Sequence, residues 1–138
     1  MGSFFSIIAG VIVSVVSGAV GYVFATFYIR PILRYCDLKH QLIVDLIVYA
    51  NAVNPEGYND FIKEHHEKRV IALRTHSAEF LACYEDLPKI FKKLLNCRNE
   101  DPGNAADNLM VLSNTTDYED AHKQVDKIKK HLNISISI

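Results

Sequence analysis

Apolar residues are concentrated at the start of the chain, and charged residues follow later. No charged side chain occurs before Arg30, and nearly every residue from Phe4 to Ile29 is apolar or small. A helix needs about 20 such residues to cross a hydrocarbon core ~30 Å thick. A charged residue at its centre would cost about 2.5–3.5 kcal/mol on insertion scales. The pattern therefore predicts a single membrane-spanning helix over residues 1–30.

Two other interpretations of this segment are weaker. A cleaved signal peptide has a basic start, an apolar stretch of about 7–15 residues and small residues at the cleavage site. Here no Lys or Arg precedes the apolar stretch, and a buried core helix of this length is unusual in so short a chain. We therefore expect a retained membrane anchor. Aromatic residues occupy the region where cleavage would fall: Tyr22, Phe24, Phe27 and Tyr28.

Helical periodicity continues after the apolar segment and stops at the turn-forming residues 54–57. We predict a stalk helix over residues 31–54, with Pro31 in its first turn or at a kink. Its apolar stripe recurs at intervals of three or four residues, which is typical of one helical face. The stripe consists of Leu38, Leu42, Leu46, Tyr49 and Val53.

The rest of the sequence predicts a cytosolic helical domain over residues 58–133, followed by a tail, 134–138, that is either a strand or loose. Helices are expected over 58–84, 87–95 and 105–112, and a last helix begins at a capping box, TDYE. In the second of these helices, Asp86 is the expected cap and four residues are expected to point inward: Ile90, Phe91, Leu94 and Leu95. The last helix carries an apolar seam suited to helix–helix contact: Tyr118, Ala121, Val125, Ile128 and Leu132. The predicted fold class is all-α.

The charges that flank the apolar segment predict its orientation. Arg30, Arg34 and Lys39 follow its C-terminal end, and no basic side chain precedes it. Basic residues next to a span stay on the cytoplasmic side. We therefore expect a single-pass protein of the plasma (inner) membrane, with its N-terminus outside, its C-terminal domain in the cytosol and these three residues at the membrane interface.

Small residues in the span are spaced four, three, four and four apart, so they share one helical face. In membranes, small faces let helix backbones approach closely, which drives association. We expect a homo-oligomer of four or more subunits whose spans pack on this face, although small residues are also common in spans that do not associate. The stripe consists of Gly10, Ser14, Ser17, Gly21 and Ala25.

Composition narrows the function only slightly. The formal net charge is −1, so a global basic excess of the kind found in nucleic-acid-binding proteins is missing. The three cysteines, Cys36, Cys83 and Cys97, are scattered without a CxxC spacing and are expected to be reduced thiols.

The most unusual soluble stretch is KEHHEKRVIALRTH at 63–76. It is either an ordinary solvated face, in which neighbouring glutamates neutralise the bases, or an anion site. Arginine binds phosphate with two parallel hydrogen bonds, and histidine adds charge near neutral pH. In a symmetric oligomer the patch becomes a ring. The candidate ligand-binding residues are His65, Lys68, Arg69, Arg74 and His76.

Catalysis is not expected. Arg69 and His76 match the R-x6-H spacing of RNA-cleaving domains that resemble the HEPN family, but Val70 stands where such sites have a polar residue. Glu119 and His122 form one Glu-x-x-His pair, whereas a di-metal bundle needs two. We therefore expect no catalytic residues, no metal and no cofactor.

In layout the chain resembles the small single-span effectors encoded with bacterial antiviral systems, of which the Hailong membrane effector is one. The shared traits are an uncharged span with a Gly/Ser face, the exit Ile29-Arg30-Pro31 and a small helical cytosolic part. The resemblance implies an oligomer that breaches the membrane under control of a nucleotide or oligonucleotide made by a partner enzyme. A membrane-anchored adaptor without channel activity and a HEPN-like RNase using Arg69 and His76 are the alternatives.

Overall fold

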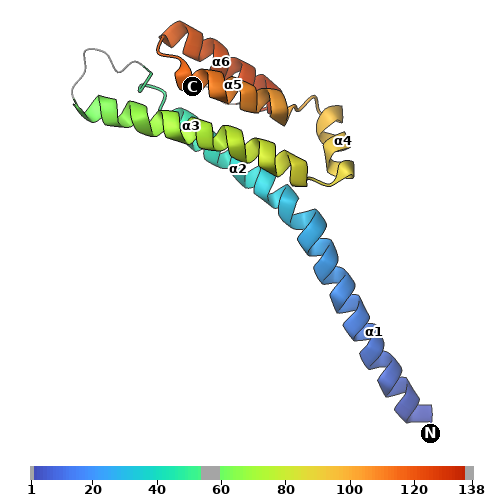
Figure 1. Cartoon of the computed structure of the whole chain (residues 1–138). Helices are drawn as coiled ribbons and strands as arrows, with labels where there is room; N and C mark the ends of the chain where they lie inside the picture. The colour runs from blue at the N-terminus through green and yellow to red at the C-terminus, as the bar shows by residue number, and fades with distance from the viewer. Residues whose placement is uncertain (1, 54–59, 136–138) are drawn as a thin grey trace.

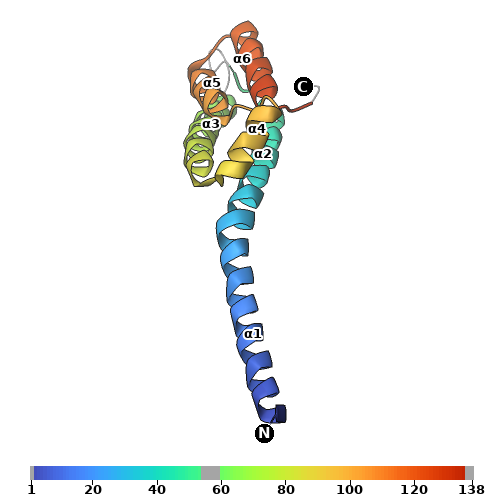
Figure 2. The same cartoon turned by 90° about the vertical axis from the view of Figure 1, so that its right-hand side faces the viewer.

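The computed structural model describes residues 2–53 and 60–135, and within them it is all-α. A single rod opens the chain: α1 (Gly2–Phe24), a π-helical segment η1 (Ala25–Ile29) and α2 (Arg30–Val48) follow one another without a break. In this rod, Phe5–Val48 is the one helix of the described ranges that is long and apolar enough to cross a membrane. Its apolar half extends away from the rest of the molecule, uncovered by other elements (Figures 1 and 2).

The rod changes direction where η1 joins α2 (Figure 1). Pro31 lies in the first turn of α2 and has no backbone N–H to donate. The N–H of Arg30, just before it, reaches back five residues to the carbonyl of Ala25, which is the π-helical pattern. The missing donor and the widened turn together account for the bend. The predicted proline kink is thus present, and the helix continues through it.

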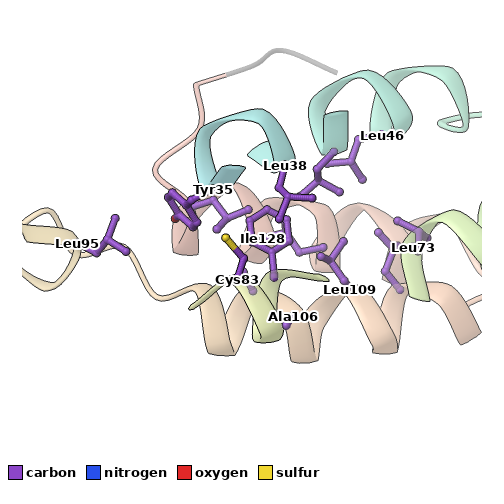
Figure 3. Close-up of a cluster of buried hydrophobic side chains, with 14 of the residues drawn as sticks. Tyr35, Leu38, Leu46, Leu73, Cys83, Leu95, Ala106, Leu109 and Ile128 are labelled. Atoms are coloured by element: carbon purple, nitrogen blue, oxygen red, sulfur yellow. The ribbon is translucent and has the colours of Figure 1, made fainter. Parts of the chain in front are cut away.

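Four further helices complete the fold: α3 (Asp60–Asp86), α4 (Lys89–Cys97), α5 (Pro102–Asn114) and α6 (Tyr118–His131). Helix α3 lies along α2 and α5, and α6 packs on α5 (Figure 1). Side chains from these elements meet in one apolar core, part of which is drawn in Figure 3. Its fully enclosed members include Leu42, Leu73, Phe80, Leu109, Ile128 and Leu132.

Helix α2 differs from the predicted stalk in two ways. It ends at Val48 rather than at residue 54, because a turn follows in which Ala50 N–H bonds Ile47 O and Ala52 N–H bonds Tyr49 O. Val53 is buried in the core, but it lies in the segment after α2 and not on the helix itself. Helix α2 is also a core element of the domain, since Leu38, Leu42 and Leu46 are all buried, and it is not a spacer between membrane and domain.

Helix α4 corrects a second prediction. It begins at Lys89 after Pro88, and Asp86 does not cap it but lies near Arg34 instead. Leu95 is buried and Phe91 packs against the core, as expected. Ile90 and Leu94, however, point outward, with 76% and 47% of their surface exposed. The four apolar residues extend over a wider arc of α4 than the part of the helix that faces the core.

The last two helices begin differently from their predictions. Helix α5 is longer than 105–112, because Asp101 caps it by accepting the N–H of Asn104 and Pro102 occupies its first turn. Helix α6 is capped by Asp117, which accepts the N–H of Asp120, in place of the predicted TDYE box. In the tail, Ile134 N–H bonds Lys129 O and closes α6, so residues 134–135 are not a strand, and 136–138 lie outside the described residues.

The central place of α2 in the core makes a quantitative prediction. Leu42→Ala removes a fully buried side chain and should lower the free energy of unfolding by about 2–5 kcal/mol. Val44→Ala, two residues on and 57% exposed, is the matched control and should change it by at most about 0.5 kcal/mol. The measurement is the urea dependence of proteolysis for the full chain in detergent. Equal effects of the two variants would contradict the core position of α2.

Candidate functional site

The basic segment 63–76 lies within α3, and the periodicity of that helix places part of it inside the molecule. Arg69, Leu73, His76 and Phe80 recur at intervals of four, three and four residues and are all buried. His65, Arg69 and His76 were expected near one face. That face is the one that α3 turns toward α2 and α5, so the sequence pattern that suggested a surface site describes an interior one.

Arg69 is 3% exposed and holds the C-terminal end of α5. Its guanidinium donates to the carbonyl of Leu112 at 2.9 Å and to that of Thr115 at 3.3 Å. The carbonyl end of a helix carries a partial negative charge, which favours a cation there. Among the described residues no carboxylate pairs with Arg69. Burial lowers the pKa of Arg69, and the nearby Tyr118 acts in the opposite direction.

His76 joins α3 to α2. Its Nε2 lies 2.7 Å from a carboxylate oxygen of Asp45, and both groups are shielded from water to a large extent. Its Nδ1 is buried and has no hydrogen-bond partner among the described residues. The contact is therefore a fixed link between two helices, and it uses the ring nitrogen that an external ligand would otherwise meet.

The other three candidate residues have separate surroundings. The ring of His65 lies between Phe61 and Tyr49, at centroid distances of 4.5 and 6.2 Å. Lys68 pairs with Glu64 on the exposed side of α3. Arg74 donates to Asn114 at 2.8 Å and thus also contacts the end of α5. Within one chain the five residues do not converge on a common surface.

A pocket opens beside Arg69, between the C-terminal half of α2 and the first turns of α6. The pocket is small, with a cavity volume of about 40 Å³, and it is open to solvent on one side. Most of its wall is apolar, and its polar groups come from Arg69, Asp45, Tyr118 and His122. The Tyr118 hydroxyl donates to Asn51 O at 3.1 Å. The remaining wall consists of Leu46, Tyr49, Ala50, Val53, Leu73, Leu112, Ala121 and Val125.

This pocket contains residues that the sequence did not mark as a site. Asp45 and Tyr118 belong to apolar stripes of two helices far apart in the chain, and His122 was noted only as half of an incomplete metal pair. No local spacing relates them to Arg69. A charged residue inside the stripe of α2, as Asp45 is, was the one available signal, because such a group needs a buried partner.

The residues expected at the membrane interface also have partners. Arg30 is exposed, and the Arg34 guanidinium lies 3.7 Å from Asp86. Lys39 points into the domain, where its ammonium donates to the buried Glu100 at 2.9 Å. The Tyr35 hydroxyl donates to the same carboxylate, and burial together with that negative charge raises the pKa of Tyr35 far above its usual value.

The span residues have no partners from the domain. An added Cβ at Gly10, Gly18 or Gly21 would meet nothing within 4 Å, so these glycines are not required by packing within the chain. The hydroxyl of Ser14 donates to Gly10 O, four residues earlier, which satisfies it inside the helix. The small-residue face is therefore free for contact with lipid or another helix.

With this geometry known, we compared the chain with known proteins. It matches no protein-family model, and neither the curated proteins nor the solved structures include one similar to it.

The opposite surroundings of two adjacent residues provide a test of the interior site. Arg69→Met removes two hydrogen bonds to the end of α5 and should lower the free energy of unfolding by about 1.5–3 kcal/mol. Lys68→Met removes an exposed ion pair and should leave unfolding unchanged. Urea-dependent proteolysis of the full chain measures both. If Arg69→Met is as stable as the original chain, Arg69 does not hold α5.

Proposed function

We propose that this chain is a homo-oligomeric membrane effector whose spans form a regulated ion-conducting or membrane-disrupting pore. The observation that carries the proposal is the continuity of the helix Phe5–Val48. Its first part needs an apolar surrounding, and its last part, α2, is a core helix of the domain. A rearrangement of the domain therefore moves the span directly. A simple anchor does not need this rigid connection.

Assembly is proposed to use the small-residue face of the span. Close contact between helices in a membrane depends on dispersion between approaching backbones, which small side chains permit. Gly10 and Gly21 have open space beside them. Four or more subunits are needed for a path between spans, with the N-terminus outside and the domain in the cytosol. Ser14, Ser17 and Ala25 complete the face.

The proposed control ligand is an anionic nucleotide or oligonucleotide made by a partner enzyme, in antiviral defence. The support is the pocket beside Arg69, in which a buried cation without a carboxylate partner adjoins an apolar wall. A phosphate would add a full negative charge to the partial one that the α5 carbonyls offer Arg69, and a base or sugar would cover the apolar wall, whose carboxylate, Asp45, is bound to His76. A longer oligonucleotide would continue past the pocket toward exposed basic side chains of α3 such as Lys68.

Such a ligand can act on the span because the pocket is shared by helices that meet at the end of α2. It is lined by α2 at Asp45 and Leu46, by the segment after α2 from Tyr49 to Val53, and by α6 from Tyr118 to Val125. A ligand shifts an equilibrium by the difference in its affinity for the two states. If the pocket closes around the ligand, α2 changes its position relative to α6 and carries α1 with it.

Two alternatives find less support. An adaptor that binds a partner through the seam of α6 would need that seam to be free, but Ala121, Ile128 and Leu132 are buried against the same chain. A HEPN-like RNase would need Arg69 and His76 at the surface between two subunits. Both are almost fully buried within one chain and bonded there.

The assembly part predicts a position-specific effect in the span. Gly21→Leu should block association and abolish ion flux, because the added side chain holds neighbouring helices apart. Val23→Leu adds bulk to the other side of the span, where we expect lipid, and should change neither. Native mass in mild detergent and depolarisation of expressing cells are measured together. Labelling of Ser3→Cys from outside, with Cys97 unlabelled, confirms insertion and orientation. An unchanged mass and flux in Gly21→Leu would contradict the packing face.

The ligand part predicts a loss of affinity at the pocket rim. His122→Glu places a negative charge in the pocket wall and should weaken binding of short oligoadenylates and adenosine monophosphate about tenfold or more, which is ~1.4 kcal/mol. Lys127→Glu, on the same helix and outside the pocket, is the control and should have little effect at physiological salt. Calorimetry of the full chain in detergent measures both. Equal losses would indicate a non-specific electrostatic effect and place the ligand elsewhere.

A further inference from the structure

Helix α4 presents apolar side chains that the domain does not cover. Ile90 is 76% exposed and Leu94 47%, while Phe91 and Leu95 of the same helix pack on the core. Ile90 and Leu94 are four residues apart and thus lie on one face of α4. This face is distinct from the pocket beside Arg69 and from the small-residue face of the span.

The position of α4 along the rod is set by two contacts. The Cys83 thiol lies 3.8 Å from the carbonyl of Pro31, and the Arg34 guanidinium lies 3.7 Å from Asp86. The end of α3 is therefore held at the first turns of α2. Helix α4 begins three residues after Asp86, close to where the rod leaves the domain (Figure 2), and its Phe91 ring lies 6.0 Å from that of Tyr35 in α2.

The length of the span places this part of the domain at the membrane surface. The helix from Phe5 to Ile29 measures about 37 Å at 1.5 Å per residue, somewhat more than the ~30 Å hydrocarbon core. The headgroup layers extend the bilayer to about 40–45 Å. The first turns of α2 therefore lie in or directly above the cytosolic headgroups, and the start of α4, tied to them, lies at the same depth.

The charges near Ile90 suit a lipid surface. Lys89 and Lys93 are exposed, and Lys92 covers the ring of Tyr84 and donates to Glu85 O. Acidic side chains also lie at this end of the domain: Glu85 is exposed, Asp86 is near Arg34, and Asp37 and Glu79 line a depression with Arg30 and Arg34. Basic side chains beside an apolar face are typical of helices that bind the interface of anionic membranes.

We propose that α4 is a second membrane contact, in which Ile90 and Leu94 enter the headgroup region of the bilayer that α1 crosses and Lys89 and Lys93 bind anionic lipid phosphates. The domain is then held to the membrane at two places, by the span and by α4. This contact limits how far the domain can turn about the span, and it does not depend on whether the spans form a pore.

Spin labels in the full chain, reconstituted in vesicles of phosphatidylethanolamine and phosphatidylglycerol, test the contact. The exposed Cys36 and Cys97 are first replaced by Ser, and the buried Cys83 is retained. Labels at Ile90→Cys and Leu94→Cys should be more accessible to oxygen, which enters the bilayer, than to a water-soluble nickel chelate. Ile71→Cys and Val111→Cys, 66% and 49% exposed, are matched controls and should show the opposite preference.

Two results would overturn the proposal. Equal preference for the nickel chelate at positions 90 and 71 would place α4 in water. Strong spin–spin broadening at position 90, removed by dilution with unlabelled chain, would show that a second copy covers this face instead of lipid.

The charge of α4 provides an independent measurement. Lys89→Glu with Lys93→Glu should reduce the oxygen preference at position 94 in vesicles that contain phosphatidylglycerol and leave it unchanged in purely zwitterionic ones, because only anionic headgroups attract lysine. Lys127→Glu with Lys130→Glu, exposed on α6, is the control pair and should have no effect. A reduction of equal size by both pairs would contradict a local contact at α4.

Discussion

A helix can enter hydrocarbon only if it satisfies its backbone hydrogen bonds internally, and in this protein the helix that is long and apolar enough to do so continues into the domain without a joint. Only the π-helical turn Ala25–Ile29 and Pro31 interrupt the regular pattern, and they bend the rod without ending it. A change in the way α2 packs in the domain therefore also changes the orientation of the span. Helix α3 packs along the last part of this element, α5 packs on α3, and α6 packs on α5.

Buried polar contacts fix α2 against its neighbours more specifically than its leucines do. Asp45 meets His76 of α3, and about 9–15 Å nearer the start of α2 Tyr35 and Lys39 meet Glu100, which follows α4. Leucines tolerate small shifts, whereas a buried charge separated from its partner is costly. The two contacts lie on faces of α2 about 80–120° apart and together resist its rotation. Any state in which α2 turns must break or replace them.

Exposed apolar side chains occur along α1 and on α4, near the end of the domain where the rod leaves it, and also on α2, α3 and α5, as at Ile47, Ile71 and Val111. At the end of the domain far from the span, Arg69 is enclosed beside a pocket and bonded to the end of α5. The exposed apolar side chains of α4 and the pocket beside Arg69 thus lie at opposite ends of the domain. Helix α2 connects the two.

The sequence by itself determined the features that depend on neighbours along the chain. The uncharged run before Arg30 predicted a helix long enough for a membrane, and intervals of three and four residues predicted an all-α fold with nearly correct limits for α3. These follow from the period of a helix, which residues within a few turns decide. The end of α2 was missed because Val53 continues the periodic stripe, although a turn carries it to the core.

Tertiary structure decided which faces are interior. Arg69 and His76 are residue types usually found at the surface. They are buried here because Arg69 donates to carbonyls more than forty residues later in the chain and His76 contacts a carboxylate of α2. Conversely, Ile90 and Leu94 are residue types usually found in a core but are exposed here, because Phe91 and Leu95 form the contact between α4 and the core. A local pattern states which residues share a face. Whether that face meets protein, water or lipid depends on partners that are distant in sequence.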